Sequence, residues 1–507
     1  MNKERFKSVL LIGLIVLSVV LTKNLLDSKT PEIAVNPDVA VSTVSSSLNI
    51  ERIIYPQDFI IGFGGGSYTG VYSEETRNTI WSLTTELLPA YLSQLDLTVI
   101  DEEEFRAIEK TRSLQMRLPF AISLNNFGEV YGVERGFHEI LDSPIDKIVI
   151  SSSQPNRVYL ANFEDGQYCY LKGYEAEQRI ATQISKVSEA MTTEFRRVDS
   201  LVNFRVLQED GDQTFFNEEI IPITGVEPIP FVKVAKEIDA LAERQDSEIQ
   251  TLLIKAFGNS SDFIKRLEEI DGSKTYIYGY GDKALRLGIS GEISYQEKLS
   301  SSVETSSVSF KEGLDIALGF IDGYGTSPQS LYLTDYQVTK DGVYEVKSYY
   351  FDYRMRDLSI FTKNMTGGHG IEVVMKNDVV TKFKKNIRRY VKSIDASEIW
   401  ADGPMFIEAI INKNFDVISE NFVKDKAIDI NDTETNWQMS TYVLGIMQSL
   451  KNVELTYYLD STLDDERLIP AWSLEIADTL YYFHLYTGDI LMMEKIGVPE
   501  EVALSRK

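Results

Sequence analysis

The stretch "GFGGGSYTG" at residues 62–70 has the glycine content of a loop that binds phosphate. Consecutive glycines let backbone N–H groups point at an anion, and the N-terminus of a following helix adds a positive dipole end. A phosphate loop also needs a lysine and then Ser or Thr directly after its last glycine. Counting from Gly65, those positions hold Gly70, Val71 and Tyr72, so the lysine is missing.

A dinucleotide fingerprint fits no better, because its helix opens at the glycines, whereas "SYTGVYS" is strand-like. The spacing favours a β-hairpin that turns at Gly64, Gly65 and Gly66, with Ser73 capping a helix that starts at Glu74. We therefore expect the glycines to serve architecture, although a ligand at residues 62–70 is left open.

Residues able to hold a metal or to act as acid and base are dispersed. The three histidines lie far apart, and none belongs to an HExxH or HxH motif, which argues against zinc; they are His138, His369 and His484. The acidic run "DDE" at 464–466 is typical of a solvated turn in so acidic a chain. No GxSxG motif occurs, and "NDTETNW" lacks the spacing of a calcium loop. We predict no catalytic residue, no metal and no cofactor.

Cys169 is the single cysteine, so no intramolecular disulfide can form. It alternates with tyrosines in "QYCYLKG", which predicts a buried, inert thiol in a strand.

One segment departs from the acidic balance. The stripe "TKFKKNIRRYVK" is rich in cations, which can form a docking face for an acidic partner or polymer, or for the acidic surface of the chain itself. A solvated strand edge is the alternative. The candidate docking residues are Lys382, Lys384, Lys385, Arg388 and Arg389.

The N-terminal residues predict a membrane anchor. A basic stub, 1–7, precedes an uncharged run, and residues 8–26 reach about 28 Å as a helix, near the thickness of the hydrocarbon core. A cleavable signal peptide would share this pattern, but "VLTKNLLDSK" offers no small-x-small cleavage site. We expect a single uncleaved span with the stub in the cytoplasm and the rest of the chain outside.

Small and hydroxyl residues on one helical face can mark where another transmembrane helix approaches. Ser18 and Thr22 lie four residues apart, hence on one face. The candidate transmembrane interface consists of Leu11, Leu14, Ile15, Ser18 and Thr22.

Composition limits the partners. The chain has 507 residues and a formal net charge of −26, so nucleic acid and anionic lipid headgroups would repel it. With 43% hydrophobic residues it can fill several cores.

The alternation of apolar and polar residues, together with the serine-rich and glycine-rich segments between these runs, predicts an α+β ectodomain in three parts. A Ser/Thr/Val-rich stalk, 27–50, leads to an N-terminal α+β domain, 51–198, a middle domain, 199–305, and a C-terminal domain, 306–507. In the middle domain, "VKVAKEIDALAERQ" and "SSDFIKRLEEI" are expected as helices and "KTYIYGYGDKALRLGISGEISYQEK" as a meander.

The last two hundred residues predict the same arrangement twice, a helix followed by a small antiparallel sheet. "SFKEGLDIALGFIDGYG" and "MSTYVLGIMQSLKNV" are each expected as a helix followed by an antiparallel sheet. Each unit ends in a hairpin, with its turn at Asn377-Asp378 or Gly488-Asp489.

The anchor ending "LTKNLL", the meander "YIYGYGDKALRLGISGEISY" and the C-terminal "LIPAWSLEI" and "YYFHLYTGDI" together resemble the YycH family. The last part is also similar to YycI and to PepSY-type modules. The resemblance implies a membrane-anchored extracytoplasmic regulator of a WalK-type sensor histidine kinase that controls cell-wall metabolism. It implies contacts with the kinase and with a YycI-like protein, partly through transmembrane helices. An anchored PepSY-like protein that restrains a protease, and an enzyme with an unrecognised site, are the alternatives.

Overall fold

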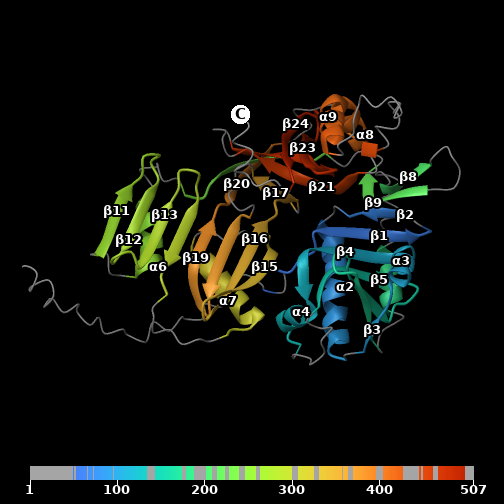
Figure 1. Ribbon diagram of the computed structural model, residues 1–507, viewed down its shortest axis with the longest axis horizontal. Coiled ribbons are helices and arrows are strands. Elements are labelled where there is room, and N and C mark those ends of the chain that lie inside the picture. The colour runs from blue at the N-terminus through green and yellow to red at the C-terminus, as the bar shows by residue number, and fades with distance from the viewer. Residues whose placement is uncertain are drawn as a thin grey trace, which may run out of the picture. The chain divides into compact units, whose positions relative to one another are not determined.

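The computed structural model describes the chain between residues 50 and 496 (Figure 1). Within these bounds the longer stretches left undescribed are 134–142, 174–178, 188–200, 208–213, 223–227, 239–245, 300–306, 325–329, 363–368, 395–402, 426–444 and 461–465. The predicted anchor, 8–26, and the predicted stalk up to residue 49 lie outside the described residues. No described helix combines the length and apolar character needed to cross a membrane.

A seven-stranded antiparallel sheet forms the N-terminal part, with strand order β2-β1-β4-β5-β6-β7-β3. Its strands are β1 (Asp58–Gly64), β2 (Ser67–Gly70), β3 (Leu97–Val99), β4 (Arg112–Ser123), β5 (Pro144–Ser151), β6 (Arg157–Asn162) and β7 (Gln167–Lys172). Strand alternation divides the side chains of the sheet between two cores, because successive residues point to opposite faces.

Helices cover both faces of this sheet. The helices α2 (Glu74–Leu92) and α4 (Leu124–Val130) pack on the face that carries Ile148, Leu160 and Cys169. On the other face α3 (Glu102–Glu109) packs against Val149, Tyr159 and Tyr168. Asp101 caps α3 by accepting the backbone N–H of Glu104 at 2.8 Å.

An eight-stranded antiparallel sheet follows, in the order β11-β12-β13-β14-β19-β18-β16-β15. Its strands are β11 (Ile264–Glu268), β12 (Lys274–Tyr278), β13 (Lys283–Leu287), β14 (Ile293–Glu297), β15 (Leu331–Asp341), β16 (Tyr344–Tyr353), β18 (Ile371–Lys376) and β19 (Val379–Lys385). The helices α6 (Asp246–Phe257) and α7 (Phe310–Gly323) cover the face that carries Leu285 and Phe351.

A third sheet holds the C-terminal strands. Its central order is β17-β21-β22-β10-β20, and β23 and β24 continue from β22. The strands are β10 (Phe231–Lys236), β17 (Ser359–Thr362), β20 (Arg388–Ile394), β21 (Leu450–Leu459), β22 (Arg467–Ile476), β23 (Thr479–His484) and β24 (Ile490–Lys495). The helices α8 (Ile407–Lys413) and α9 (Phe415–Asp425) add apolar side chains to the core that its strands form, and a separate two-stranded ribbon pairs β8 (Leu201–Leu207) with β9 (Thr214–Pro222).

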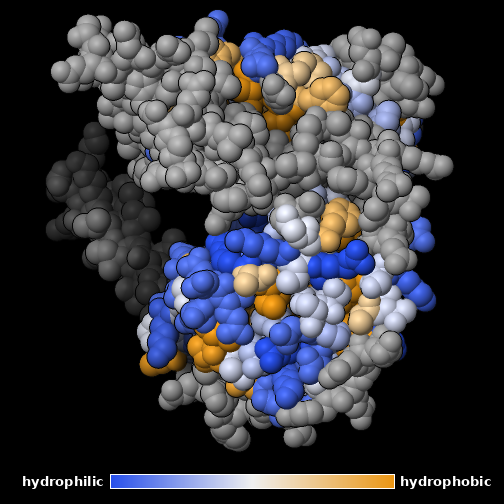
Figure 2. Space-filling view, turned by 90° about the vertical axis from the view of Figure 1, so that its right-hand side faces the viewer, coloured by the Kyte–Doolittle hydropathy of each residue, from blue (hydrophilic) through white to orange (hydrophobic). Residues whose placement is uncertain are grey.

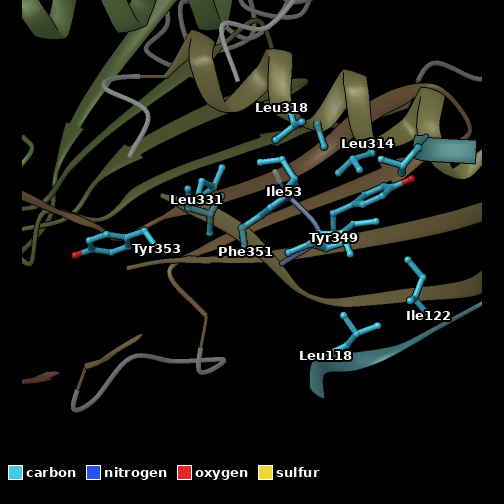
Figure 3. Close-up of a cluster of buried hydrophobic side chains, with 14 of the residues drawn as sticks. Ile53, Leu118, Ile122, Leu314, Leu318, Leu331, Tyr349, Phe351 and Tyr353 are labelled. Atoms are coloured by element: carbon cyan, nitrogen blue, oxygen red, sulfur yellow. The ribbon is translucent and has the colours of Figure 1, made fainter. Parts of the chain in front are cut away.

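The first two sheets share one hydrophobic core. Figure 3 shows side chains of β4, such as Leu118 and Ile122, gathered with Ile53 and with residues of α7 and β16. The backbone N–H of Leu333 in β15 also donates to the carbonyl oxygen of Ile53 at 2.8 Å. A continuous core of this kind makes the packing of the two sheets interdependent.

The repeated C-terminal plan is present as two four-stranded antiparallel meanders, β15-β16-β18-β19 and β21-β22-β23-β24. Both predicted turns occur, with left-handed backbone at Asn377 (φ 56°) and Gly488 (φ 70°). The mixed α+β class predicted from the sequence is confirmed. The expected helix at 439–453 is helical at residues 445 and 446, and β21 begins at Leu450.

Two predicted helices of the middle region are wrong. "VKVAK" lies in β10, which pairs with β20 and β22, and "IKRLE" is β11, which pairs with β12. Strand pairing overrides the local helical preference of these segments: β10 pairs with strands far along the chain, whereas β11 forms a hairpin with the next strand, β12. β14 pairs with β19, so the predicted boundary at residue 305 falls within a single sheet.

Candidate functional site

The glycine-rich stretch is a β-hairpin, as predicted. β1 pairs with β2 through Ile60–Gly70 and Ile61–Thr69, and Gly64 (φ 93°) and Gly65 (φ 63°) make the turn. The following helix, α2, begins at Glu74, three residues beyond Val71. The strand β2 thus separates the glycines from the helix N-terminus, and a shared anion site of the phosphate-loop type does not form.

The predicted basic docking face is divided by strand alternation. Lys382 and Lys384 lie on one side of β19, where Lys382 pairs with Glu372 at 2.8 Å and Lys384 with Glu292 at 3.3 Å. Lys385 points to the other side, is buried, and pairs with Glu237 at 3.0 Å.

Arg388 is also buried, and its Nε and Nη2 donate to Glu466 at 2.8 and 3.1 Å. Lys385 and Arg388 therefore cannot belong to an exposed docking face, because each is enclosed with its carboxylate partner. Arg389 is exposed on β20, beside exposed Tyr390 and Lys392. Docking through Lys382, Lys384 and Arg389 stays a prediction.

The described surface drawn in Figure 2, which is the right-hand side of the molecule in Figure 1, is mixed in character. Over the described residues on the face drawn in Figure 2, hydrophobic residues are scattered among hydrophilic ones. A partner that met the described part of this face would contact polar and charged side chains as well as apolar ones.

The two described histidines make local hydrogen bonds. His484 accepts the backbone N–H groups of Tyr486 and Thr487 at Nδ1, both at 3.2 Å, and burial lowers the pKa of its imidazole. His369 Nδ1 lies 3.0 Å from Thr334 Oγ1. His138 lies outside the described residues. Within the described part of the chain, no three acidic, histidine or cysteine residues come together as a metal site.

Cys169 is buried in β7, as predicted, and burial raises the pKa of its thiol to about 12. A thiol with that pKa carries almost no thiolate at neutral pH and is a poor nucleophile. The acidic run at 464–466 is described only at Glu466, the buried partner of Arg388, which corrects the expected solvated turn at that residue. The candidate transmembrane interface, Leu11 to Thr22, lies outside the described residues.

The structure brings together a polar cavity that the sequence analysis missed. Its volume is about 30 Å³, room for one or two water molecules. The lining comes from the start of β1 and the residue before it, from α2, from the residue after β16, from β17 and from β21; it consists of Gln57, Asp58, Arg77, Arg354, Ser359, Val453, Glu454 and Leu455.

Arg354 provides the cationic side of the cavity. Its guanidinium lies over the rings of Tyr55 and Tyr332, 4.7 and 4.4 Å from their centroids, and Nη2 donates to the carbonyl oxygen of Pro56 at 2.8 Å. Arg354 is only 6% exposed, and its buried Nη1 has no hydrogen-bond partner among the described residues. A buried donor beside a polar cavity is a place for a bridging water molecule.

Glu454 provides the acidic side. Its carboxylate accepts the hydroxyl of Ser359 at 2.5 Å and the amide of Gln57 at 3.4 Å. Burial raises the pKa of Glu454, and the nearby carboxylate of Asp58 raises it further. Asp58 is itself held by Arg117, whose Nε donates at 2.7 Å.

The residues that line the cavity are spread along the chain from Gln57 to Leu455, so no local sequence motif predicts the cavity. The sequence feature that could have pointed to it is Glu454 in the apolar strand "VELTYYL", because a carboxylate in a buried strand needs hydrogen-bond donors or a cation. Small-molecule sites usually exceed about 300 Å³, so this cavity suits water and proton exchange rather than a substrate.

No protein-family model matches the chain, and no curated protein matches it. The solved structures that it resembles include YycH from Bacillus subtilis, with 12% identity and a TM-score of 0.48 over 87% of this chain and 96% of that one. An uncharacterized protein from Eubacterium rectale has 12% identity and a TM-score of 0.30, over 58% of this chain and 88% of that one. The C-terminal domain of Bacillus megaterium YpeB has 10% identity and a TM-score of 0.22, over 52% of this chain and 100% of that domain. The resemblance to YycH predicted from the sequence is confirmed as a similarity to its solved structure, and at such identities the similarity assigns no activity to this chain.

Proposed function

We propose that this chain is a membrane-anchored, extracytoplasmic regulator of a WalK-type sensor histidine kinase, acting by contact rather than by catalysis. The observation that carries the proposal is the set of sequence motifs that resemble the YycH family. These motifs form the meander β12-β13-β14 and the strands β22 and β23, and most of their apolar side chains are buried. The resemblance therefore resides in residues that determine the packing of two different sheets.

A further feature supports a contact mechanism. The chain carries a net charge of −26, so its ectodomain would be repelled by anionic lipid and would extend toward other proteins from the anchor at residues 8–26.

The anchor is proposed to recognise another transmembrane helix through the face that carries Ser18 and Thr22. A second contact, on the ectodomain, is proposed for the exposed cation Arg389 on β20, with Lys382 and Lys384 adding to it where their ion pairs with glutamates open. A YycI-like protein is proposed as a further partner.

The test is co-purification of the full chain with the sensor kinase from detergent-solubilised membranes, together with kinase-dependent transcription. We expect association to weaken when Ser18 and Thr22 are both replaced by Leu, because Leu removes the small, hydroxyl-bearing contact surface. The control exchanges Val16 and Val20, on another part of the helix, for Leu.

Full association and signalling through an unrelated apolar span would reduce the anchor to a tether. Absence of any kinase association, combined with inhibition of a membrane protease, would replace the proposal by the PepSY-like alternative. Robust hydrolase turnover by the chain would contradict it in favour of an enzyme.

A further inference from the structure

The contact at Glu454 joins parts of the chain that are nearly four hundred residues apart. Gln57 precedes β1 of the N-terminal sheet, Ser359 begins β17, and Glu454 lies in β21 of the third sheet. Both hydrogen bonds converge on one carboxylate, so its charge state acts on the two sheets at once.

From this arrangement we propose that Glu454 is a proton-sensitive latch between the N-terminal sheet and the C-terminal sheet, which closes more tightly when the carboxylate takes up a proton through the adjoining cavity.

The charged neighbours of Glu454 come from every element packed around it. Asp58 of β1 repels the ionised carboxylate, whereas Arg354 and Arg117 attract it. Arg77 of α2 completes the charged lining of the cavity. Arg117 binds Asp58 at 2.7 Å, and Arg354 is held by the carbonyl oxygen of Pro56 and by the rings of Tyr55 and Tyr332.

The neutral polar neighbours are able to serve both charge states. Thr456 lies 2.9 Å from Ser359 Oγ, so the serine hydroxyl can donate to Glu454 or, by turning to Thr456, accept from a protonated carboxyl. The phenols of Tyr332 and Tyr482 interact electrostatically with Glu454. Both remain neutral, because burial raises the pKa of each phenol.

The sign follows from the direction of the shift. Burial and Asp58 raise the pKa of Glu454 in the folded chain above its ordinary value of 4.5. Ionisation therefore weakens the latch above the folded-state pKa, and the full strength of the contact returns as pH falls toward 4.5. Each unit of upward shift corresponds to about a tenfold change in the opening equilibrium.

The test compares amide hydrogen exchange of the full chain, in mild detergent, with that of Glu454→Gln at each pH from 7.5 to 4.5. The reporter is the backbone N–H of Gln57, which donates to the carbonyl oxygen of Arg117 at 2.8 Å; we expect it to lose protection when the latch opens, because release of the Gln57 side chain from Glu454 frees the segment before β1. At pH 7.5 we expect exchange several-fold slower in Glu454→Gln, because the amide reproduces the neutral carboxyl. The ratio should approach one at the acid end.

Two further variants keep the result decisive. Ser359→Ala removes a hydrogen bond that favours the ionised carboxylate, so the pH at which wild-type protection changes should move upward. Glu475→Gln, which removes the charge of a carboxylate that binds Asn452 on the same pair of strands, should leave the profile unchanged. A ratio independent of pH, or the same profile in Glu475→Gln, would overturn the latch; kinase association plays no part in this readout.

Discussion

The buried ion pair between Arg388 and Glu466 allows a sharp test of the structure. Arg388 donates two hydrogen bonds to Glu466, and its Nη1 donates to Asn386 Oδ1 at 2.8 Å. The pair joins the start of β20 to the start of β22, and both side chains are buried. Replacing Arg388 by Met would leave the Glu466 carboxylate buried without a cation.

An uncompensated buried charge costs far more than the pair contributes. We expect Arg388→Met to lower the free energy of unfolding by about 3–5 kcal/mol. The double variant Arg388→Met/Glu466→Leu should recover most of this loss, since an apolar pair of similar volume needs no ionic partner. Lys382→Met is the matched control: Lys382 and its partner Glu372 lie nearer the solvent, so a loss of about 0–1 kcal/mol is expected.

The assay is urea unfolding followed by tryptophan fluorescence. The double-mutant cycle compares the wild type, Arg388→Met, Glu466→Leu and the double variant under the same conditions. Trp472 lies in β22, the strand that follows Glu466, and reports on this sheet. A loss below about 1 kcal/mol for Arg388→Met, equal to that of Lys382→Met, would refute the reasoning because it would place Arg388 in water.

Three more outcomes follow from the structure. Gly65→Val should lower stability by about 1–3 kcal/mol through backbone strain, because φ is 63° and, apart from the chain neighbours of Gly65, no atom of the described residues lies within 4 Å of the added Cβ; calorimetry should detect no binding of ATP or NAD by either protein. Cys169 should resist a maleimide at pH 7.5 in the folded chain and react after urea unfolding, since its thiol pKa is about 12; labelling at equal rates in both states would contradict its burial. Gly313→Ala should cost about 1–3 kcal/mol in thermal unfolding, because the new Cβ would lie 2.2 Å from Tyr349 Oη, and the loss should shrink when Tyr349 is also changed to Phe.

The sequence alone predicted features that depend on neighbouring residues. The glycine hairpin, the buried Cys169, the turns at Asn377 and Gly488 and the mixed α+β class all follow from local backbone preference and from the two-residue period of strands. These constraints act within a few residues, so they can be recognised without knowing what packs against the segment.

Tertiary structure decided the features that depend on a distant partner. β10 is a strand because β20 and β22, which lie far along the chain, pair with it, although its sequence predicted a helix. The basic stripe is divided because Glu237 and Glu466 enclose Lys385 and Arg388, while Lys384 points the other way. The cavity needs Gln57, Arg354 and Glu454 at once, and only folding brings a donor and a carboxylate so far apart in sequence to one cavity of about 30 Å³. A charged side chain can be buried only where the fold provides a partner for it, because removing it from water is costly. The residues next to it in the sequence do not show whether such a partner will be there.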